Sequence, residues 1–175
     1  MQPAAATRWE MAESFTPAGL PLEKASRYRQ LEAEIIAVLA GETDAVARMA
    51  TVCSMVASAF PDFLWTGFYR VDTDRAEELV VAPYQGSLGC LRIPFGRGVC
   101  GAAALGRQTV IVADVEAFDG HIACDSRSRS EIVVPVFDPA GVLLAVLDID
   151  SAEIGAFDSL DQKALESLMF EVFGR

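Results

Sequence analysis

A polar stretch over residues 120–135 holds the residues of this chain that are best suited to chemistry. It contains the single histidine, His121, together with Cys124, two arginines and Glu131. The stretch ends on the apolar run 132–134, which has the character of a buried strand, so reactive groups are placed at the rim of a rigid core element. A cysteine beside two arginines is held partly as thiolate, the form that attacks.

Asp148 and Asp150 form a second reactive group, at the end of another apolar run. Residues two apart on a strand point to the same face, whereas Ile149 points to the opposite face. Two carboxylates that close repel each other, so at least one should bind a cation or an amino group, or have a raised pKa. Two solvated aspartates at a strand end would give the same pattern, and from the sequence alone both interpretations stay open.

The four cysteines, at positions 53, 90, 100 and 124, leave several kinds of chemistry open. A zinc site would need the three later cysteines to converge with His121, which their spacing does not require. A Cys–His peptidase would need the pair to come from distant parts of the fold, yet His121 and Cys124 share one loop. A dithiol–disulfide cycle between Cys90 and Cys124 fits better. Cys53 is expected to be a small buried core residue.

Composition excludes several classes of protein. Hydrophobic residues make up 52% of the 175 residues and the mean hydropathy is +0.30, which excludes a disordered chain. A net charge of -11 disfavours nucleic acid and anionic membrane surfaces as partners. No apolar run reaches the roughly 18 residues of a membrane-spanning helix. The N-terminus lacks the apolar core of a signal peptide, so we expect a cytoplasmic protein with reduced thiols.

Apolar periodicity predicts helices near both ends of the chain and strands between them. The expected helices cover residues 22–39, a segment capped by Asp44, residues 99–105 and residues 159–173, and the expected strands cover residues 63–71, 79–82, 109–113, 131–137 and 142–149. Residues 1–20 are expected to form a flexible tail, which leaves residues 21–175 as a single domain. This order predicts an α+β fold, with a mostly antiparallel sheet, the N-terminal helix pair and the C-terminal helix on one face, and loops on the other.

Two of these elements carry side chains whose role the sequence leaves open. On the strand over 63–71, Trp65, Gly67 and Tyr69 share one face, and the glycine leaves a notch in which a small ligand could lie against the rings. Two core aromatics beside a close backbone contact would give the same pattern, and this strand alone favours that interpretation. In the helix that Asp44 caps, the expected buried face consists of Val46, Met49, Val52, Cys53 and Val56.

Together these segments resemble the free methionine-R-sulfoxide reductases, a family with a GAF-like fold. The residues that carry the resemblance are 65–69, 83–86, Cys90, 93–101, 120–135 and 147–150. It implies that Cys124 is the catalytic cysteine and that Cys90 resolves it, with Cys100 as a third, auxiliary thiol.

The resemblance also implies a substrate pocket. Trp65 and Tyr69 match an aromatic wall around the methylthio end of the substrate. Glu131, Asp148 and Asp150 match carboxylates that bind its polar parts and the sulfoxide oxygen. Backbone N–H groups before Cys124 suit the substrate carboxylate.

The chemistry that follows is the reduction of free L-methionine-R-sulfoxide. The Cys124 thiolate would attack sulfur while Glu131, assisted by Asp150, delivers a proton to the oxygen. Cys124 would become a sulfenic acid, Cys90 would condense with it to a disulfide, and thioredoxin, supplied by thioredoxin reductase and NADPH, would restore both thiols. No metal or organic cofactor is expected, and a homodimer through the first helix is compatible with the sequence.

A GAF-type sensor, which binds a small ligand without catalysis, is the alternative from another class. It explains the fold and the aromatic notch equally well, but it gives Cys90 and Cys124 no role.

Overall fold

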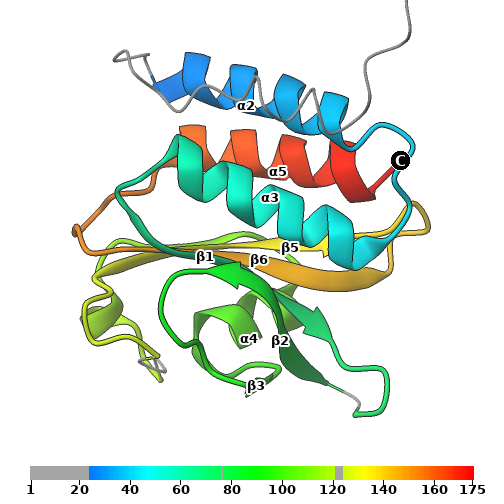
Figure 1. Cartoon of the computed structure of the whole chain (residues 1–175). Helices are drawn as coiled ribbons and strands as arrows, with labels where there is room; N and C mark the ends of the chain where they lie inside the picture. The colour runs from blue at the N-terminus through cyan, green and yellow to red at the C-terminus, as the bar shows by residue number, and fades with distance from the viewer. Residues whose placement is uncertain (1–23, 76, 121–123) are drawn as a thin grey trace, which may run out of the picture.

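The structure, a computed structural model, describes residues 24–75, 77–120 and 124–175 (Figure 1). The expected tail over residues 1–20 and the first helical positions before Lys24 therefore lie outside the described residues. The elements are, in order, α2 (Lys24–Val38), α3 (Ala45–Ala59), β1 (Phe63–Val71), β2 (Glu78–Gln85), β3 (Arg92–Pro94), α4 (Gly98–Gly106), β4 (Val110–Val112), the 3-10 helix η1 (Val115–Ala117), β5 (Ser130–Phe137), β6 (Leu143–Ser151) and α5 (Ser159–Phe173).

The strands form one six-stranded sheet in the order β3-β2-β1-β6-β5-β4, and each neighbouring pair is antiparallel. In Figure 1, α3 and α5 lie on one face of the sheet, α2 covers them from outside, and α4 lies on the opposite face. The expected α+β fold is confirmed, including the N-terminal helix pair and the C-terminal helix on a shared face. The sequence did not predict β3 or η1, because each has three residues, too few to show a period.

Two apolar cores flank the sheet. The larger one joins α2, α3 and α5 to one face and includes Phe68 and Ile149, neither of which is exposed to solvent. The smaller one joins α4 and β3 to the other face and includes Trp65 and Tyr69, which are 4% and 2% exposed. Alternate residues of β1 thus face different cores, as strand geometry requires. The candidate site residues belong to the face of the smaller core.

The helix α3 begins as expected but buries a different set of residues. The Asp44 side chain accepts a hydrogen bond from the backbone N–H of Ala47 at 2.8 Å, which satisfies a free donor of the first turn. Val46 was expected on the buried face, but it is 58% exposed. At 100° per residue, Val46 lies roughly 100° around the helix from the centre of the buried face. Met55 and Ala59 are buried on that face instead.

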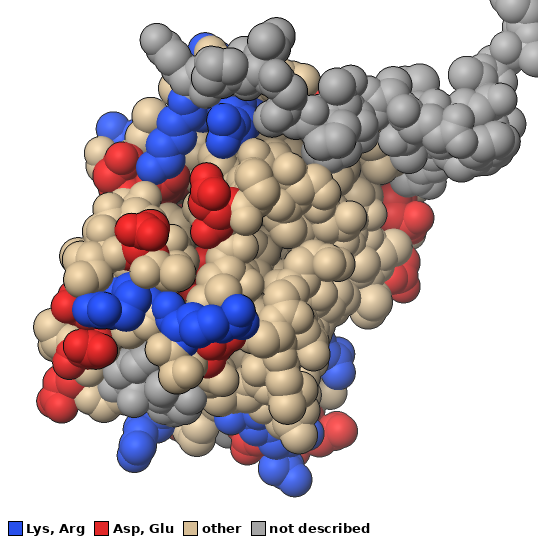
Figure 2. All heavy atoms as spheres, turned by 60° about the vertical axis from the view of Figure 1, so that its left-hand side comes forward, with Lys and Arg blue, Asp and Glu red and all other residues tan. Residues whose placement is uncertain are grey.

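Charged side chains are mixed on the face shown in Figure 2, where cationic and acidic groups alternate around broad uncharged areas. A phosphate backbone needs a continuous basic surface, and this face does not offer one. Within residues 24–75, 77–120 and 124–175, no helix combines the length and the apolar character that a bilayer span requires.

The start of α5 depends on Asp161, which is completely buried. Its carboxylate accepts hydrogen bonds from the Tyr28 hydroxyl at 2.9 Å and from the backbone N–H of Asp158 at 2.8 Å, and it pairs with the Lys24 ammonium. Asp158 in turn caps the helix through the backbone N–H groups of Leu160 and Asp161, which completes a capping box. One buried carboxylate therefore fastens α2 to the start of α5.

Replacing Asp161 with alanine is expected to destabilise the fold strongly. The Tyr28 hydroxyl and the Asp158 N–H would lose their partner, and breaking a buried, hydrogen-bonded ion pair costs about 3 kcal/mol in free energy of unfolding. Urea denaturation measures this loss. The matched control is Asp62→Ala at an exposed turn, which should change stability by less than about 0.5 kcal/mol. Equal effects of the two substitutions would contradict the anchoring role of Asp161.

Candidate active site

Three adjacent strands place the expected site residues on one face of the sheet. Trp65 on β1 lies opposite Asp150 on β6, and Asp150 lies opposite Glu131 on β5. Two residues further along β6, Asp148 lies opposite Gly67 on β1. Since alternate residues share a face, the three carboxylates and the Trp65 ring converge. The structure therefore brings together the residues that the sequence singled out on these strands.

Aromatic side chains of β1 and β2 form a stacked wall. The Trp65 ring lies between Tyr69 and Tyr84, with ring centroids 5.6 Å and 5.3 Å away and interplanar angles of 22° and 18°. A Cβ atom at Gly67 would collide with the Trp65 ring and with Tyr84. The notch at Gly67 is thus filled by Trp65 itself, which confirms the interpretation as a close contact between core residues. Trp65 and Tyr69 nevertheless line the cavity beside it.

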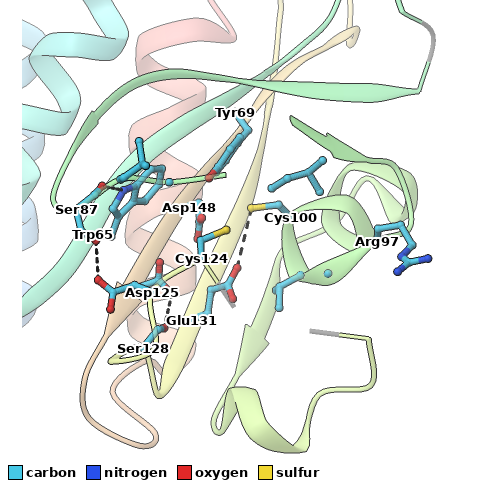
Figure 3. Close-up of a pocket in the computed structure, with 16 residues that line it drawn as sticks. Trp65, Tyr69, Ser87, Arg97, Cys100, Cys124, Asp125, Ser128, Glu131 and Asp148 are labelled. Carbon is cyan, nitrogen blue, oxygen red and sulfur yellow. Dashed lines mark hydrogen bonds between the residues drawn. The ribbon is translucent and has the colours of Figure 1, made fainter. Parts of the chain in front are cut away.

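A small cavity lies between this wall, the carboxylates and the start of α4 (Figure 3). Its free volume is about 30 Å³. The lining residues are Trp65, Tyr69, Ser87, Leu88, Gly89, Ile93, Arg97, Gly98, Val99, Cys100, Cys124, Asp125, Ser128, Glu131, Asp148 and Asp150. Every expected site residue except Cys90 is among them.

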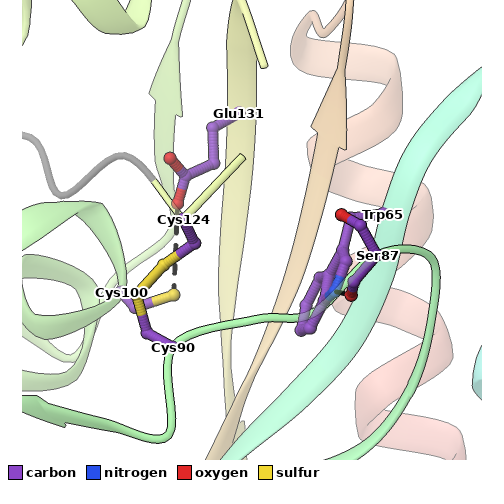
Figure 4. The surroundings of a disulfide bond; sticks show 6 residues. All are labelled: Trp65, Ser87, Cys90, Cys100, Cys124 and Glu131. Carbon is purple, nitrogen blue, oxygen red and sulfur yellow. Dashed lines mark hydrogen bonds between the residues drawn. A yellow bond between two sulfur atoms is a disulfide. The ribbon is translucent and has the colours of Figure 1, made fainter. Parts of the chain in front are cut away.

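Cys90 and Cys124 are joined in a disulfide whose Cα atoms are 5.6 Å apart (Figure 4). Cys124 is exposed, whereas Cys90 is half-buried and packs against the smaller core. The other two cysteines, Cys53 and Cys100, are buried free thiols. Cys53 lies in the larger core, and burial raises its pKa to about 12, as expected for an inert core residue.

The carboxylates sit in an environment that favours their neutral forms. Glu131 and Asp148 are each 6% exposed. Burial raises the pKa of Glu131 well above its usual range, and the charge of Asp150 raises it further. The pKa of Asp148 is raised by burial and then by the charges of Glu131 and Asp150. The sequence predicted that at least one of Asp148 and Asp150 binds a cation or an amino group or has a raised pKa. In the structure the pKa is raised at Asp148 and also at Glu131.

The buried thiol of Cys100 lies next to the carboxyl groups of Glu131 and Asp148. Its thiol is 4.0 Å from Glu131 Oε1, and burial followed by the charges of Asp148 and Glu131 raises its pKa well above the usual value. The sulfur of Cys100 and carboxylate oxygens of Glu131 and Asp148 lie within 4.8 Å of one another, a spacing that metal ligands also show. Cys100 therefore belongs to the same buried cluster as Glu131 and Asp148.

A polar network that the sequence did not predict links the two disulfide loops. The Trp65 indole N–H donates to the Ser87 carbonyl at 3.1 Å, and the Ser87 hydroxyl donates to Asp125 Oδ2 at 2.6 Å. Arg127 donates to the same carboxylate through its backbone N–H at 2.9 Å and its guanidinium at 2.7 Å. These contacts, with the Arg127 guanidinium first, hold the pKa of Asp125 well below its usual range. Nearness to Cys124 was the available sequence signal for Asp125.

Ser128 is a second residue that the sequence did not single out. Its hydroxyl donates to Asp150 Oδ1, which ties the loop after Cys124 to β6. The backbone N–H of Arg129 donates to the Ser151 carbonyl at 2.8 Å and strengthens the same junction.

His121 lies outside the described residues, as do the backbone N–H groups at 122 and 123. The zinc and peptidase interpretations both used His121. Both also required free sulfurs, and in this structure the sulfurs of Cys90 and Cys124 are bonded to each other.

Comparison with known proteins gives consistent matches. The family model described as GAF domain matches residues 43–172. GAF domain-containing protein A of Dictyostelium discoideum is 45% identical over 83% of this chain and 90% of its own length. The free methionine-R-sulfoxide reductase of Escherichia coli is 40% identical over 86% of this chain and 89% of its own. The free methionine-R-sulfoxide reductase of Neisseria meningitidis, solved with its substrate, superposes with a TM-score of 0.84 at 46% identity, covering 90% of this chain and 92% of that one.

Proposed function

The chain belongs to the free methionine-R-sulfoxide reductase family of GAF domains, and we propose that it reduces free L-methionine-R-sulfoxide to methionine. The observation that carries the proposal is the Cys90–Cys124 disulfide at the rim of a cavity lined by buried carboxyl groups. A thiol that can be oxidised and an acid that can protonate oxygen are the two groups that sulfoxide reduction needs. Relatives that bear this enzyme's name support the same activity.

In the first step the Cys124 thiolate attacks the sulfoxide sulfur. An oxide is a poor leaving group, so Glu131 protonates the sulfoxide oxygen as the S–O bond breaks, and Asp150 modulates the proton affinity of Glu131 through its charge. The attack joins the Cys124 sulfur to the substrate sulfur. The protonated oxygen then passes to the Cys124 sulfur, the bonds from the substrate sulfur to oxygen and to Cys124 both break, and methionine leaves with Cys124 as a sulfenic acid. Sulfur in the substrate gains two electrons and Cys124 loses two.

In the second step Cys90 attacks the sulfenic sulfur of Cys124, and the oxygen leaves as water. The product is the disulfide that the structure shows. A dithiol protein of the thioredoxin type then reduces it by exchange, with electrons from thioredoxin reductase and NADPH. Cys100 is not part of this disulfide. We assign it the role of an auxiliary thiol next to the Glu131 carboxyl group.

Substrate recognition follows from the surroundings of the cavity. The Trp65 and Tyr69 rings offer an apolar wall to the methylthio group. Glu131, Asp148 and Asp150 offer negative charge and hydrogen bonds to the ammonium and the sulfoxide oxygen. Backbone N–H groups of the first turn of α4, where Gly98 lines the cavity, suit the substrate carboxylate.

The proposal also covers cofactors, the cellular compartment and the oligomeric state. It uses no metal or organic cofactor, because the thiols carry the electrons and the carboxyl groups carry the proton. A thioredoxin-dependent cycle fits the cytoplasm, where dithiol reductants maintain protein thiols. A homodimer through the outward side of α2 is part of the same proposal, and Ile36 on that helix is 42% exposed.

The test is NADPH consumption in the presence of thioredoxin and thioredoxin reductase, with three substrates compared. We expect turnover with free methionine-R-sulfoxide and none with the S epimer or with a peptide-bound sulfoxide. If the protein reduces none of the three, the reductase proposal fails, and a GAF-type sensor that only binds a small ligand becomes the better account.

The disulfide form should not bind substrate. Its cavity has a free volume of about 30 Å³, far less than methionine sulfoxide requires. Calorimetric titration of the oxidised protein with the free R epimer should give binding at least tenfold weaker than that of the Cys124→Ser protein, in which the Cys90–Cys124 bond cannot form. Equal affinities would contradict closure of the cavity by the disulfide.

A further inference from the structure

We infer that the hydrogen bond between Ser87 and Asp125 is a clamp that holds the Cys90 loop against the Cys124 loop while the two thiols are apart, and so sets the rate of disulfide formation. The inference rests on the proposed function, because it concerns the second step of that reaction. It assigns Ser87 and Asp125 as positioning residues.

Each loop is fastened to its own strand near the cysteine. The Cys90 loop lies on the β1 wall: the Ser87 carbonyl accepts from Trp65, the Tyr69 hydroxyl is hydrogen-bonded to the backbone of Cys90, and a Cβ at Gly89 would come within 2.8 Å of that hydroxyl. These contacts orient the Cys90 loop on β1, but they do not reach the opposite loop.

The Cys124 loop is fastened to β6 instead. Ser128 donates to Asp150, and Arg129 donates to the Ser151 carbonyl. The two thiols therefore sit on loops with separate anchors, and once the disulfide is reduced their separation depends on contacts between the loops.

Ser87 and Asp125 supply such a contact. Ser87 precedes Cys90 by three residues and Asp125 follows Cys124 directly, so the 2.6 Å bond joins the two loops that carry the disulfide cysteines (Figure 3). The Asp125 side chain is only 13% exposed, and Arg127 holds its carboxylate by two kinds of donor. A charged acceptor fixed in this way binds a hydroxyl more strongly than a neutral acceptor does.

The step that the clamp serves is the condensation of two sulfurs. The Cys90 sulfur attacks the Cys124 sulfenic sulfur, the S–O bond breaks, and the departing hydroxide takes up a proton to leave as water. No external oxidant takes part, because the sulfoxide has already oxidised Cys124. A loop that is held in place raises the effective concentration of the attacking thiol. When the loop is released, the Cys124 sulfenic acid reacts more slowly and persists for longer.

The test follows both steps in one experiment. Fully reduced protein is mixed with free methionine-R-sulfoxide without any reductant, and the released methionine, the disulfide and the sulfenic acid are measured over time, with a 1,3-dione to trap the sulfenic acid. In Ser87→Ala we expect methionine release at the wild-type rate, disulfide formation about tenfold slower, and more trapped sulfenic acid. The Ser87 carbonyl that binds Trp65 remains in this variant.

Two further variants separate positioning from a general structural effect. Ser87→Thr retains a hydroxyl and should restore the rate of disulfide formation. Ser126→Ala, a matched change at an exposed residue of the same loop, should leave both steps unchanged. Disulfide formation at the wild-type rate in Ser87→Ala would overturn the clamp, and so would slowing confined to methionine release. If the wild-type protein releases no methionine, the proposed function itself fails, an outcome distinct from failure of the clamp.

Discussion

Replacing Cys124 with serine is expected to lower turnover of free methionine-R-sulfoxide by about three orders of magnitude or more. A serine hydroxyl at this position is a far weaker nucleophile than a thiolate, and it cannot form the sulfenic acid that stores the substrate oxygen. Cys124 is exposed at the cavity rim, so the substitution removes no core contact and the fold should persist. The coupled NADPH assay measures the loss.

Two other cysteine variants are the controls for this prediction. Cys90→Ser should still release one methionine per chain, but it should not be recycled through an intramolecular disulfide. Cys100→Ser should retain most turnover, because Cys100 is a free thiol outside the disulfide. Turnover in Cys124→Ser together with its loss in Cys100→Ser would move the nucleophile to Cys100 and contradict the assignment.

Replacing Glu131 with glutamine is expected to lower the rate of methionine release by about two to four orders of magnitude. The amide has nearly the shape of the acid and can hydrogen-bond to the substrate, but it cannot supply a proton. Burial and the charge of Asp150 raise the pKa of Glu131, so the wild-type acid stays protonated to higher pH than an exposed glutamate. In the wild type, methionine release should therefore fall as pH rises through that raised pKa, and Glu131→Gln should show no such fall.

The same substitution should not lower stability at alkaline pH. A carboxyl whose pKa is higher in the folded than in the unfolded state stabilises the fold fully below its unfolded value, near 4.3, and this contribution is lost as pH rises through the folded value. Glu131→Gln should then be at least as stable as the wild type at alkaline pH. The matched control is Glu153→Gln at an exposed position, which should alter neither quantity. A folded Glu131→Gln variant that releases methionine at the wild-type rate would contradict the assignment of Glu131 as the acid.

The architecture was largely predictable from the sequence, since long elements have clear periods. The helix over 159–173 and the strand over 63–71 match α5 and β1 residue for residue. The prediction failed for β3, where three residues pair with β2 through tertiary contacts, and for Val46, which lies at the edge of its helix face. The apolar period of a helix identifies its buried face, but it does not show how much of that face the neighbouring elements bury.

The site was predictable in its residue types and less so in its contacts. Strand alternation placed Asp148 and Asp150 together without further information, because their spacing fixes a shared face. The loop positions of Cys90 and Cys124 already favoured a disulfide cycle between them, whereas their separate roles as attacking and resolving thiols came from the family resemblance. The bond between Ser87 and Asp125 joins residues 38 positions apart, and no periodic pattern reports which loops meet.

The most direct measurement is a single turnover of reduced protein with free methionine-R-sulfoxide in the absence of reductant, followed by peptide mapping of the product. The proposed mechanism predicts one methionine per chain and a new disulfide between Cys90 and Cys124, the bond seen in the structure. Release of no methionine, or a product disulfide that involves Cys100 or Cys53 instead, would contradict it.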